Sequence, residues 1–446
     1  MAIAGSGLDA ATLQVGVRSR RMFLGASLAG LVGATGSLPA AEPAKNTSCI
    51  VFFLDGGPSH HETFDPKPEA PAQVRGEFGV TDTTVPGLTI GDRLPLLAKR
   101  ARDYSVIRSL HHGNPSHAPA EHQMLTGRMG SRSGTARAFI ETPSLGSIVS
   151  RLGGRPESGM PSYVAVPWSF HHAYGGSPFG GAAYLGASYE PFESGPPPKT
   201  TSAAFSVPSL TLGEGVTKNR LGGRRQLLGQ LDSRQRGRRA RRARAFTSEA
   251  LDLLGDERIR KVFDLSREPR AVRETYGGHE WGQGALLARR LVENGVKFVM
   301  LQCGLRQDWD THDNNFKRLG DSLLPPLDRA AAALIGDLVD RGLHQQTLVM
   351  VIGEFGRTPI VNGKAGRDHW ARVFSALVSG GGLRNGQVIG ASDTTGADPA
   401  RRAVHARDLF ATMYHALGID WTRVFTDGLG RPVPVLREAS AIAELV

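Results

Sequence analysis

The pattern of apolar residues along the chain predicts buried strands that alternate with helices. A short, uninterrupted apolar run rich in β-branched and aromatic residues occurs at 50–54 and is typical of a strand buried on both faces of a sheet; further strand candidates occur at 104–110, 296–301, 347–352 and 373–379. Other segments repeat apolar residues at helical spacing, at 94–102, 282–294, 323–341 and 408–417. The alternation predicts an α/β fold with a mostly parallel central sheet and helices on both faces.

The first 41 residues differ from this pattern and resemble an export signal. Arg20 and Arg21 precede a weakly apolar stretch of small residues from Leu24 to Leu38, which is the order of a twin-arginine (Tat) signal; an ordinary basic, apolar N-terminus is the alternative. No run is long and apolar enough for a transmembrane helix. We therefore expect a Tat signal peptide over 1–41, one domain over 42–446, a periplasmic or extracellular location, and no transmembrane segment in the mature chain.

Two segments interrupt the alternation within the domain. The segment from about 129 to 210 is rich in glycine, proline, serine and aromatic residues, which predicts a loop-rich insertion that serves as a lid or faces the substrate. The segment from about 218 to 244 is strongly basic and ends in a run of arginines from 234 to 244. We interpret it as a solvated helix face or a mobile insertion. The alternative interpretation is a surface that binds a sulfated or acidic polysaccharide. Nucleic acid is disfavoured, because no aromatic residues are interleaved for base stacking.

The first predicted strand ends in an acid. Asp55 directly follows the run 50–54, and Gly56, Gly57 and Pro58 then turn the chain. This places the carboxylate at the carboxyl end of a buried strand, where open α/β sheets bind their ligands. A buried carboxylate is costly unless its charge is offset, and a metal ion would offset it.

Two further predicted strands end in loops that carry metal-binding side chains. Asp308 and His312 follow the run 296–301, and Glu354 follows the run 347–352 with His369 in the next loop. Because the carboxyl ends of parallel strands meet at one edge, these groups can converge with Asp55. Oxygen and imidazole ligands suit divalent ions such as Zn, Mn, Fe, Mg or Ca, whereas the two cysteines lack the spacing of a zinc site. Hydrogen-bonded loop residues are the alternative interpretation of each one taken alone.

A histidine-rich loop precedes a predicted helix that ends near Thr126. Ser116 and His117 lie at about the N-terminus of this helix, where backbone N–H groups favour an anion or a nucleophile. Ser116 is therefore a candidate nucleophile; a metal-activated water and a capping role for the serine are the alternatives. Arg357 and Arg367 could bind an anionic substrate, or form structural ion pairs instead.

The motifs GGPSH, DWDTH, GEFGRTP and GRDHW, together with the twin-arginine start, resemble the exported family called domain of unknown function 1501, within the alkaline phosphatase-like superfamily of sulfatases, phosphodiesterases and mutases. The resemblance spans nearly the whole mature chain. It implies that Asp55 and Glu354 bind one metal ion and that Asp308, His312 and His369 bind a second, so one or two divalent ions (Zn, Mn, Fe or Ca) are expected.

The same resemblance implies hydrolysis of a sulfate or phosphate ester, possible substrates being sulfated or phosphorylated glycans, with Ser116 and His117 as catalytic residues and Arg128 on the substrate. Two positions depart from the superfamily. His117 stands where sulfatases have the cysteine that becomes formylglycine, and Phe355 stands where many members have a metal-binding histidine. These departures favour the alternative of a non-catalytic protein that retains metal and binds a polyanionic glycan or a partner protein.

Overall fold

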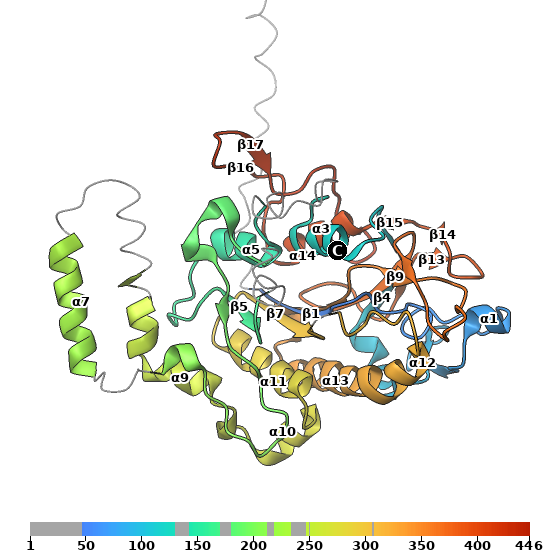
Figure 1. Cartoon of the computed structure of the whole chain (residues 1–446), viewed down its shortest axis with the longest axis horizontal. Helices are drawn as coiled ribbons and strands as arrows, with labels where there is room; N and C mark the ends of the chain where they lie inside the picture. Colours follow the sequence, from blue (N-terminus) through green and yellow to red (C-terminus); the bar gives the residue numbers. More distant parts are fainter. Residues whose placement is uncertain are drawn as a thin grey trace, which may run out of the picture. The chain divides into compact units, whose positions relative to one another are not determined.

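The computed structural model describes residues 47–129, 142–169, 180–211, 218–232, 247–248, 250–305 and 307–446. The predicted signal peptide over 1–41 and the arginine run from 234 to 244 lie outside these residues. Figure 1 shows the chain coloured along its sequence.

Strand β1 (Ser48–Leu54) lies inside the central sheet and is buried along its whole length. It pairs in parallel with β7 (Phe298–Cys303) on one side and with β8 (Thr347–Ile352) on the other. Over the described residues the sheet has nine strands, in the order β12-β4-β11-β8-β1-β7-β5-β6 with β15 beside β4. The remaining strands are β4 (Ser105–His111), β5 (Tyr163–Val166), β6 (Phe192–Glu193), β11 (Phe374–Gly380), β12 (Val388–Ile389) and β15 (Val404–His405).

The strand directions confirm the prediction of a mostly parallel sheet. β11 runs antiparallel to both of its neighbours, β4 and β8, whereas the other described pairs within this nine-stranded sheet are parallel. β4 therefore points the same way as β8 and β1. Because these strands end at one edge of the sheet, the loops that follow them meet there.

Helices cover both faces of the sheet, as predicted (Figure 1). One face carries α2 (Pro95–Lys99), α10 (Arg270–Tyr276), α11 (Glu280–Glu293) and α13 (Leu324–Asp340). The other carries α3 (His117–Thr126), α5 (Leu145–Gly153) and α14 (Ala406–Ala416). Alternate β1 residues divide between two cores, since Ile50 and Phe52 belong to the first and Val51 and Phe53 to the second. Burial on both faces explains why β1 is apolar without interruption from Cys49 to Leu54.

The segment 129–210 is more regular than the sequence predicts. Both α5 and β5 lie within it, and β5 pairs with β7, so part of this segment belongs to the sheet and its core. Residues 130–141 and 170–179 lie outside the described part. The role of this segment as a lid stays a prediction.

The basic segment begins with helix α7 (Lys218–Asp232), on which the side chains of Arg220 and Arg224 are exposed. None of the helices in the described ranges has both the length and the apolar character that crossing a membrane requires. Smaller elements are α1 (Ala72–Arg75), α9 (Glu257–Phe263), α12 (Asn315–Arg318) and the paired strands β2 (Val80–Asp82) and β3 (Thr89–Gly91), β9 (Gly356–Arg357) and β10 (His369–Trp370), β13 (Ala391–Ser392) and β14 (Pro399–Arg401), and β16 (Val424–Thr426) and β17 (Pro432–Pro434).

Candidate metal centre

The turn after β7 brings a carboxylate close to histidine side chains at the edge of the sheet. This carboxylate is that of Asp310, whereas the sequence predicts Asp308. Trp309, between them, is fully buried and its indole Nε1 donates to the carbonyl of Cys303 at 2.7 Å. Asp308 is exposed, and its Oδ2 accepts the N–H of Leu305 at 3.0 Å. Asp308 therefore stabilises the turn, while Asp310 lies among the histidines.

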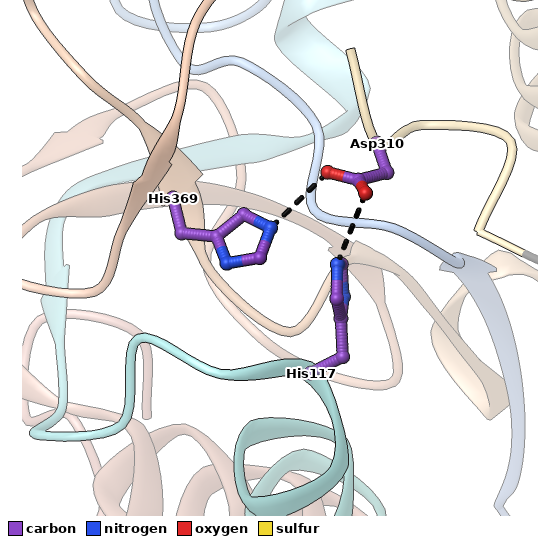
Figure 2. A group of neighbouring side chains, drawn as sticks. All are labelled: His117, Asp310 and His369. Atoms are coloured by element: carbon purple, nitrogen blue, oxygen red, sulfur yellow. Dashed lines mark hydrogen bonds and ion pairs between the residues drawn. The ribbon is translucent and has the colours of Figure 1, made fainter. Parts of the chain in front are cut away.

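Three histidines surround the Asp310 carboxylate, and they come from different parts of the fold. His369, in β10, places its Nε2 3.1 Å from Asp310 Oδ1, and His117, at the start of α3, places its Nε2 3.3 Å from Asp310 Oδ2 (Figure 2). His312, two residues after Asp310, places its Nε2 3.1 Å from Oδ1 and 3.0 Å from His369 Nε2. His117, Asp310 and His369 thus form a group that could hold a metal ion, with His312 beside it.

The second nitrogen of each ring faces an oxygen atom that can accept its proton. The Nδ1 atoms lie 2.8 Å from Glu354 Oε1 for His117, 2.6 Å from Asp368 Oδ1 for His312 and 2.8 Å from the carbonyl of Pro115 for His369. We assign the Nδ1 protons of the neutral rings from these partners. Each Nε2 then directs a lone pair toward Asp310. Histidines whose outer N–H groups are held by oxygens are characteristic of metal sites.

The distances within the centre fit a small ion. Tetrahedral coordination with bonds of 2.0–2.1 Å places ligand atoms about 3.3 Å apart. The contacts of Asp310 with the three Nε2 atoms span 3.1–3.3 Å, and His312 Nε2 lies 3.0 Å from His369 Nε2. His117, Asp310 and His369 therefore fit a divalent ion held by imidazole nitrogen and carboxylate oxygen, and His312 contacts two of these three residues.

Glu354 lies next to this centre and is fully buried at the end of β8. Its carboxylate accepts the N–H of Gly56 at 3.0 Å and lies beside His117 Nδ1. His117, Glu121 and Glu354 form a second group that could hold an ion. A neutral imidazole has one lone pair, so His117 can serve either this group through Nδ1 or the Asp310 group through Nε2.

The surroundings of His117 and Asp310 shift the pKa values of both side chains toward their charged forms. Burial alone would lower the pKa of His117, but hydrogen bonds and charges from Asp310 and Glu354 outweigh it and raise the pKa to about 9. Burial opposes ionisation of Asp310, but His117, His369 and the Arg357 guanidinium hold its pKa far below the usual range. A cation, whether a proton or a metal ion, is thus strongly favoured between these side chains.

The chain's family can be read from comparison with known proteins. A model of the family described as "Protein of unknown function (DUF1501)" matches residues 46–446. The chain belongs to this family. No curated protein matches it.

Several solved structures are similar to this DUF1501 protein. A protein in the alkaline phosphatase superfamily from Vibrio parahaemolyticus is 12% identical with a TM-score of 0.38, covering 86% of this chain and 69% of that one. The PsFucS1 sulfatase from Pseudoalteromonas sp. is 13% identical with a TM-score of 0.38, covering 84% and 68%. The lipoteichoic acid synthase LtaP from Listeria monocytogenes is 11% identical with a TM-score of 0.37, covering 89% and 76%.

Asp55 lies next to the DUF1501 centre and contacts the backbone of the turn that carries Asp310. It is fully buried, its Oδ2 accepts the N–H of Gln307 at 2.9 Å, and its carbonyl accepts the N–H of Trp309 at 3.0 Å. Asp55 belongs to neither described group that could hold an ion. In this structure it shapes the turn that presents Asp310.

The three arginines predicted to bind substrate lie in different surroundings. Arg357 is buried and donates to Asp310 Oδ1 at 2.6 Å and to backbone carbonyls. Arg367 is buried and paired with Glu62 at 2.7 Å. Arg128 follows α3, and no described contact joins its side chain to the Asp310 cluster. The geometry favours structural roles for Arg357 and Arg367, because protein acceptors occupy their guanidinium groups.

Ser116 lies at the N-cap position of α3 and is exposed. Its neighbours on both sides touch the centre, since the carbonyl of Pro115 faces His369 Nδ1 and His117 faces Asp310. Over the described residues its hydroxyl makes no side-chain capping bond. Ser116 is thus next to the candidate ligands in sequence, and its role as a nucleophile stays a prediction.

Phe355 forms the apolar wall of the centre. It is fully buried, and its ring centroid lies 5.1 Å from that of His117 and 4.6 Å from that of His369. Gly57, with a φ of 79°, approaches this ring so closely that a Cβ would lie 2.5 Å from it. The ring therefore fills the space beside His117 and His369.

Two supporting residues were missed by the sequence interpretation although signals for both exist. Asp310 and His312 are two residues apart, which puts side chains on one side of an extended segment. Glu121 is four residues after His117, one turn along the same helix face, and its Oε1 lies 3.9 Å from His117 Nδ1.

His112 holds Glu354 through the backbone. Its Nδ1 accepts the N–H of Asn114 at 3.1 Å, so its Nε2–H donates to the Glu354 carbonyl at 2.5 Å. Burial lowers the pKa of His112 to about 4, which keeps the ring neutral at neutral pH and preserves this arrangement.

Proposed function

We propose that this DUF1501 protein is an exported, metal-dependent hydrolase of sulfate or phosphate esters. One observation carries the proposal: the Nε2 atoms of His117, His312 and His369 converge on Asp310 while each Nδ1 faces an oxygen that accepts its proton. Such a set is suited to a metal ion at the carboxyl edge of the sheet. The motif resemblance supplies the ester class.

The donor set favours Zn, Mn or Fe over Ca or Mg, because three imidazole nitrogens and one carboxylate suit transition metals, whereas Ca and Mg prefer oxygen. We propose one ion, bound by His117, His369 and Asp310, with His312 beside them as a further candidate ligand. Such an ion supplies Lewis-acid chemistry toward an ester oxygen and lowers the pKa of a coordinated water.

Neighbouring side chains fix the positions of the candidate metal ligands. Arg357 fixes Asp310 Oδ1 at 2.6 Å, and Glu354 fixes the ring of His117 at 2.8 Å. Ser116, exposed beside His117, is the proposed nucleophile; an attacking water is the alternative. An anionic ester, on a glycan or on a smaller molecule, would bind on the exposed side of His312, whose side chain is 44% accessible.

A second function is supported by the buried position of Phe355. Its ring fills space beside His117 and His369, which limits the ligands that a second ion could use. A protein that retains one ion and binds a polyanionic glycan or a partner protein without cleaving it would keep the same centre. Metal content combined with an absence of turnover would favour this function.

Metal content tests the proposal most directly. Purified mature protein should contain about one equivalent of a transition metal by elemental mass spectrometry, and a His312→Ala, His369→Ala variant should lose it. His415→Ala, an exposed histidine at the end of α14, serves as the matched control and should retain the ion. No bound metal after reconstitution with Zn, Mn and Fe would refute the centre.

Ester hydrolysis separates the two functions. The metal-loaded protein should release p-nitrophenol from p-nitrophenyl phosphate, bis(p-nitrophenyl) phosphate or p-nitrophenyl sulfate, and Asp310→Asn should abolish the release. Unchanged turnover in Ser116→Ala would exclude Ser116 as the nucleophile and leave water. A metal-loaded protein inactive on all three esters would favour the binding function.

Export is the remaining part of the proposal. Arg20 and Arg21 precede an apolar stretch in the order of a Tat signal. Export of a folded chain would allow the metal to be acquired before translocation.

A further inference from the structure

A small cavity lies beside the turn that carries Asp310. Its volume is about 170 Å³, below the roughly 300 Å³ lower bound of pockets for drug-sized ligands. It therefore suits a group of a few heavy atoms. Trp168, which follows β5, and Trp281, in the first turn of α11, line it together with Glu280 and Asp308.

The cavity presents aromatic surface that is held rigidly. The ring of Trp281 stacks on that of Trp309, with centroids 5.9 Å apart and planes inclined by 22°. Trp309 is itself fully buried and hydrogen-bonded to the carbonyl of Cys303. Indole faces carry negative potential and attract cations, and tryptophan does so most strongly of the aromatic residues.

The charged side chains among the described lining residues have the same sign. Glu280 and Asp308 contribute carboxylates, and no lysine or arginine is among its described lining residues. Lys199 lies 3.5 Å from Glu280 and pairs with it, but its side chain is 79% exposed and it is not one of the lining residues. Two carboxylates and two indoles favour a cation and disfavour an anionic group.

The kind of cation follows from the lining. A bare metal ion would need several ligand atoms close together, and the described groups that could hold an ion include neither Glu280 nor Asp308. A cation with apolar methyl groups gains both from the indole faces and from the carboxylates. Recognition of quaternary ammonium by tryptophan is the established use of such an arrangement.

We propose that this cavity binds a quaternary ammonium group, such as that of choline. Binding at this cavity does not depend on the metal centre. The substrate class rests on the hydrolase function proposed above. With that function, the substrate would be a phosphate or sulfate ester that carries a quaternary ammonium group.

Isothermal titration calorimetry of the mature protein with choline chloride tests the proposal. We expect saturable binding that sodium chloride at equal ionic strength does not produce, and that the uncharged isostere 3,3-dimethylbutan-1-ol does not match. Trp281→Leu, which keeps apolar bulk, should weaken choline binding about tenfold. Glu280→Gln should weaken it several-fold, and Trp421→Leu, outside the cavity, should leave it unchanged.

Each other outcome overturns the proposal. These outcomes are no saturable choline binding, equal affinity for the uncharged isostere, or unchanged affinity in Trp281→Leu. If Trp281→Leu does not fold, as judged by circular dichroism, Trp168→Leu takes its place. The metal-free His312→Ala, His369→Ala variant should still bind choline, so loss of the metal centre and failure of the cavity proposal are distinguishable.

Discussion

Replacing Arg357 with lysine should destabilise the protein strongly, although the charge is kept. The buried guanidinium donates to the carbonyls of Gly57 at 2.8 Å and Trp309 at 3.2 Å, to the carbonyl of Gly56, and to Asp310 Oδ1 at 2.6 Å. A planar fork reaches all of these acceptors at once. A lysine ammonium is a single point with three donors and cannot reproduce this geometry.

The expected loss follows from the number of bonds. Arg357→Lys removes at least two hydrogen bonds from a charged donor to buried acceptors, each worth about 1.5–3 kcal/mol. The sum, roughly 3–6 kcal/mol, agrees with the roughly 3–5 kcal/mol measured when one partner of a buried pair is removed. Whole domains are stable by about 5–15 kcal/mol, so this one change should remove a large part of the stability.

Urea unfolding followed by circular dichroism measures this loss. Arg372→Lys is the control, because Arg372 also pairs with a carboxylate, here through two hydrogen bonds to Asp398, but on the surface. An exposed pair contributes about 0–1 kcal/mol, so the control midpoint should hardly move. An Arg357→Lys midpoint close to that of Arg372→Lys would refute the structural role of Arg357 and restore substrate binding as its function.

Three further predictions concern pH, sterics and export. Burial raises the pKa of Asp328 to about 6 against hydrogen bonds from α2, so the folded state holds this proton more tightly than the unfolded state. Its contribution to stability is therefore present below pH about 4 and lost as pH rises to about 6, and Asp328→Asn should flatten that part of the urea midpoint measured against pH. Gly57→Ala should lower the melting temperature more than Gly87→Ala, because both residues have a φ of 79° but only the Gly57 Cβ would meet the Phe355 ring; equal losses would show that backbone strain alone acts. Replacement of Arg20 and Arg21 by lysine should retain the protein in the cytoplasm by cell fractionation, and unaltered export would exclude the Tat route.

The elements of the fold that could be predicted are those that are buried along most of their length, because burial requires mainly apolar residues. β1 is buried on both faces, so its sequence is apolar from Cys49 to Leu54, and β7 and β8 beside it are apolar apart from Gln302 and Thr347. β5 escaped detection because four residues, Tyr163–Val166, are too few to establish a pattern within a segment rich in glycine and proline. Its place in the sheet comes from pairing with β7, which is a tertiary contact.

The site shows the same limit at the level of single side chains. The position of His312 and His369 after strands was enough to bring them under consideration, and the structure places their Nε2 atoms 3.0 Å apart. Spacing could not decide between Asp308 and Asp310, because that depends on how the buried Trp309 anchors the turn. The sequence could not decide between substrate binding and a structural ion pair for Arg367, because its partner, Glu62, is 305 residues away along the chain.

The occupied arginines also determine how an anionic ester could bind at all. Arg357 is used by Asp310 and backbone carbonyls, and Arg367 is used by Glu62. Among the described groups at the centre, these buried guanidinium groups therefore offer little to an incoming sulfate or phosphate. With His117 deprotonated for binding, the metal ion becomes the main positive charge available. We therefore expect metal removal to abolish binding of inorganic phosphate or sulfate, measured by calorimetry, and not only turnover; undiminished anion binding by the metal-free protein would show that another cationic group receives the substrate.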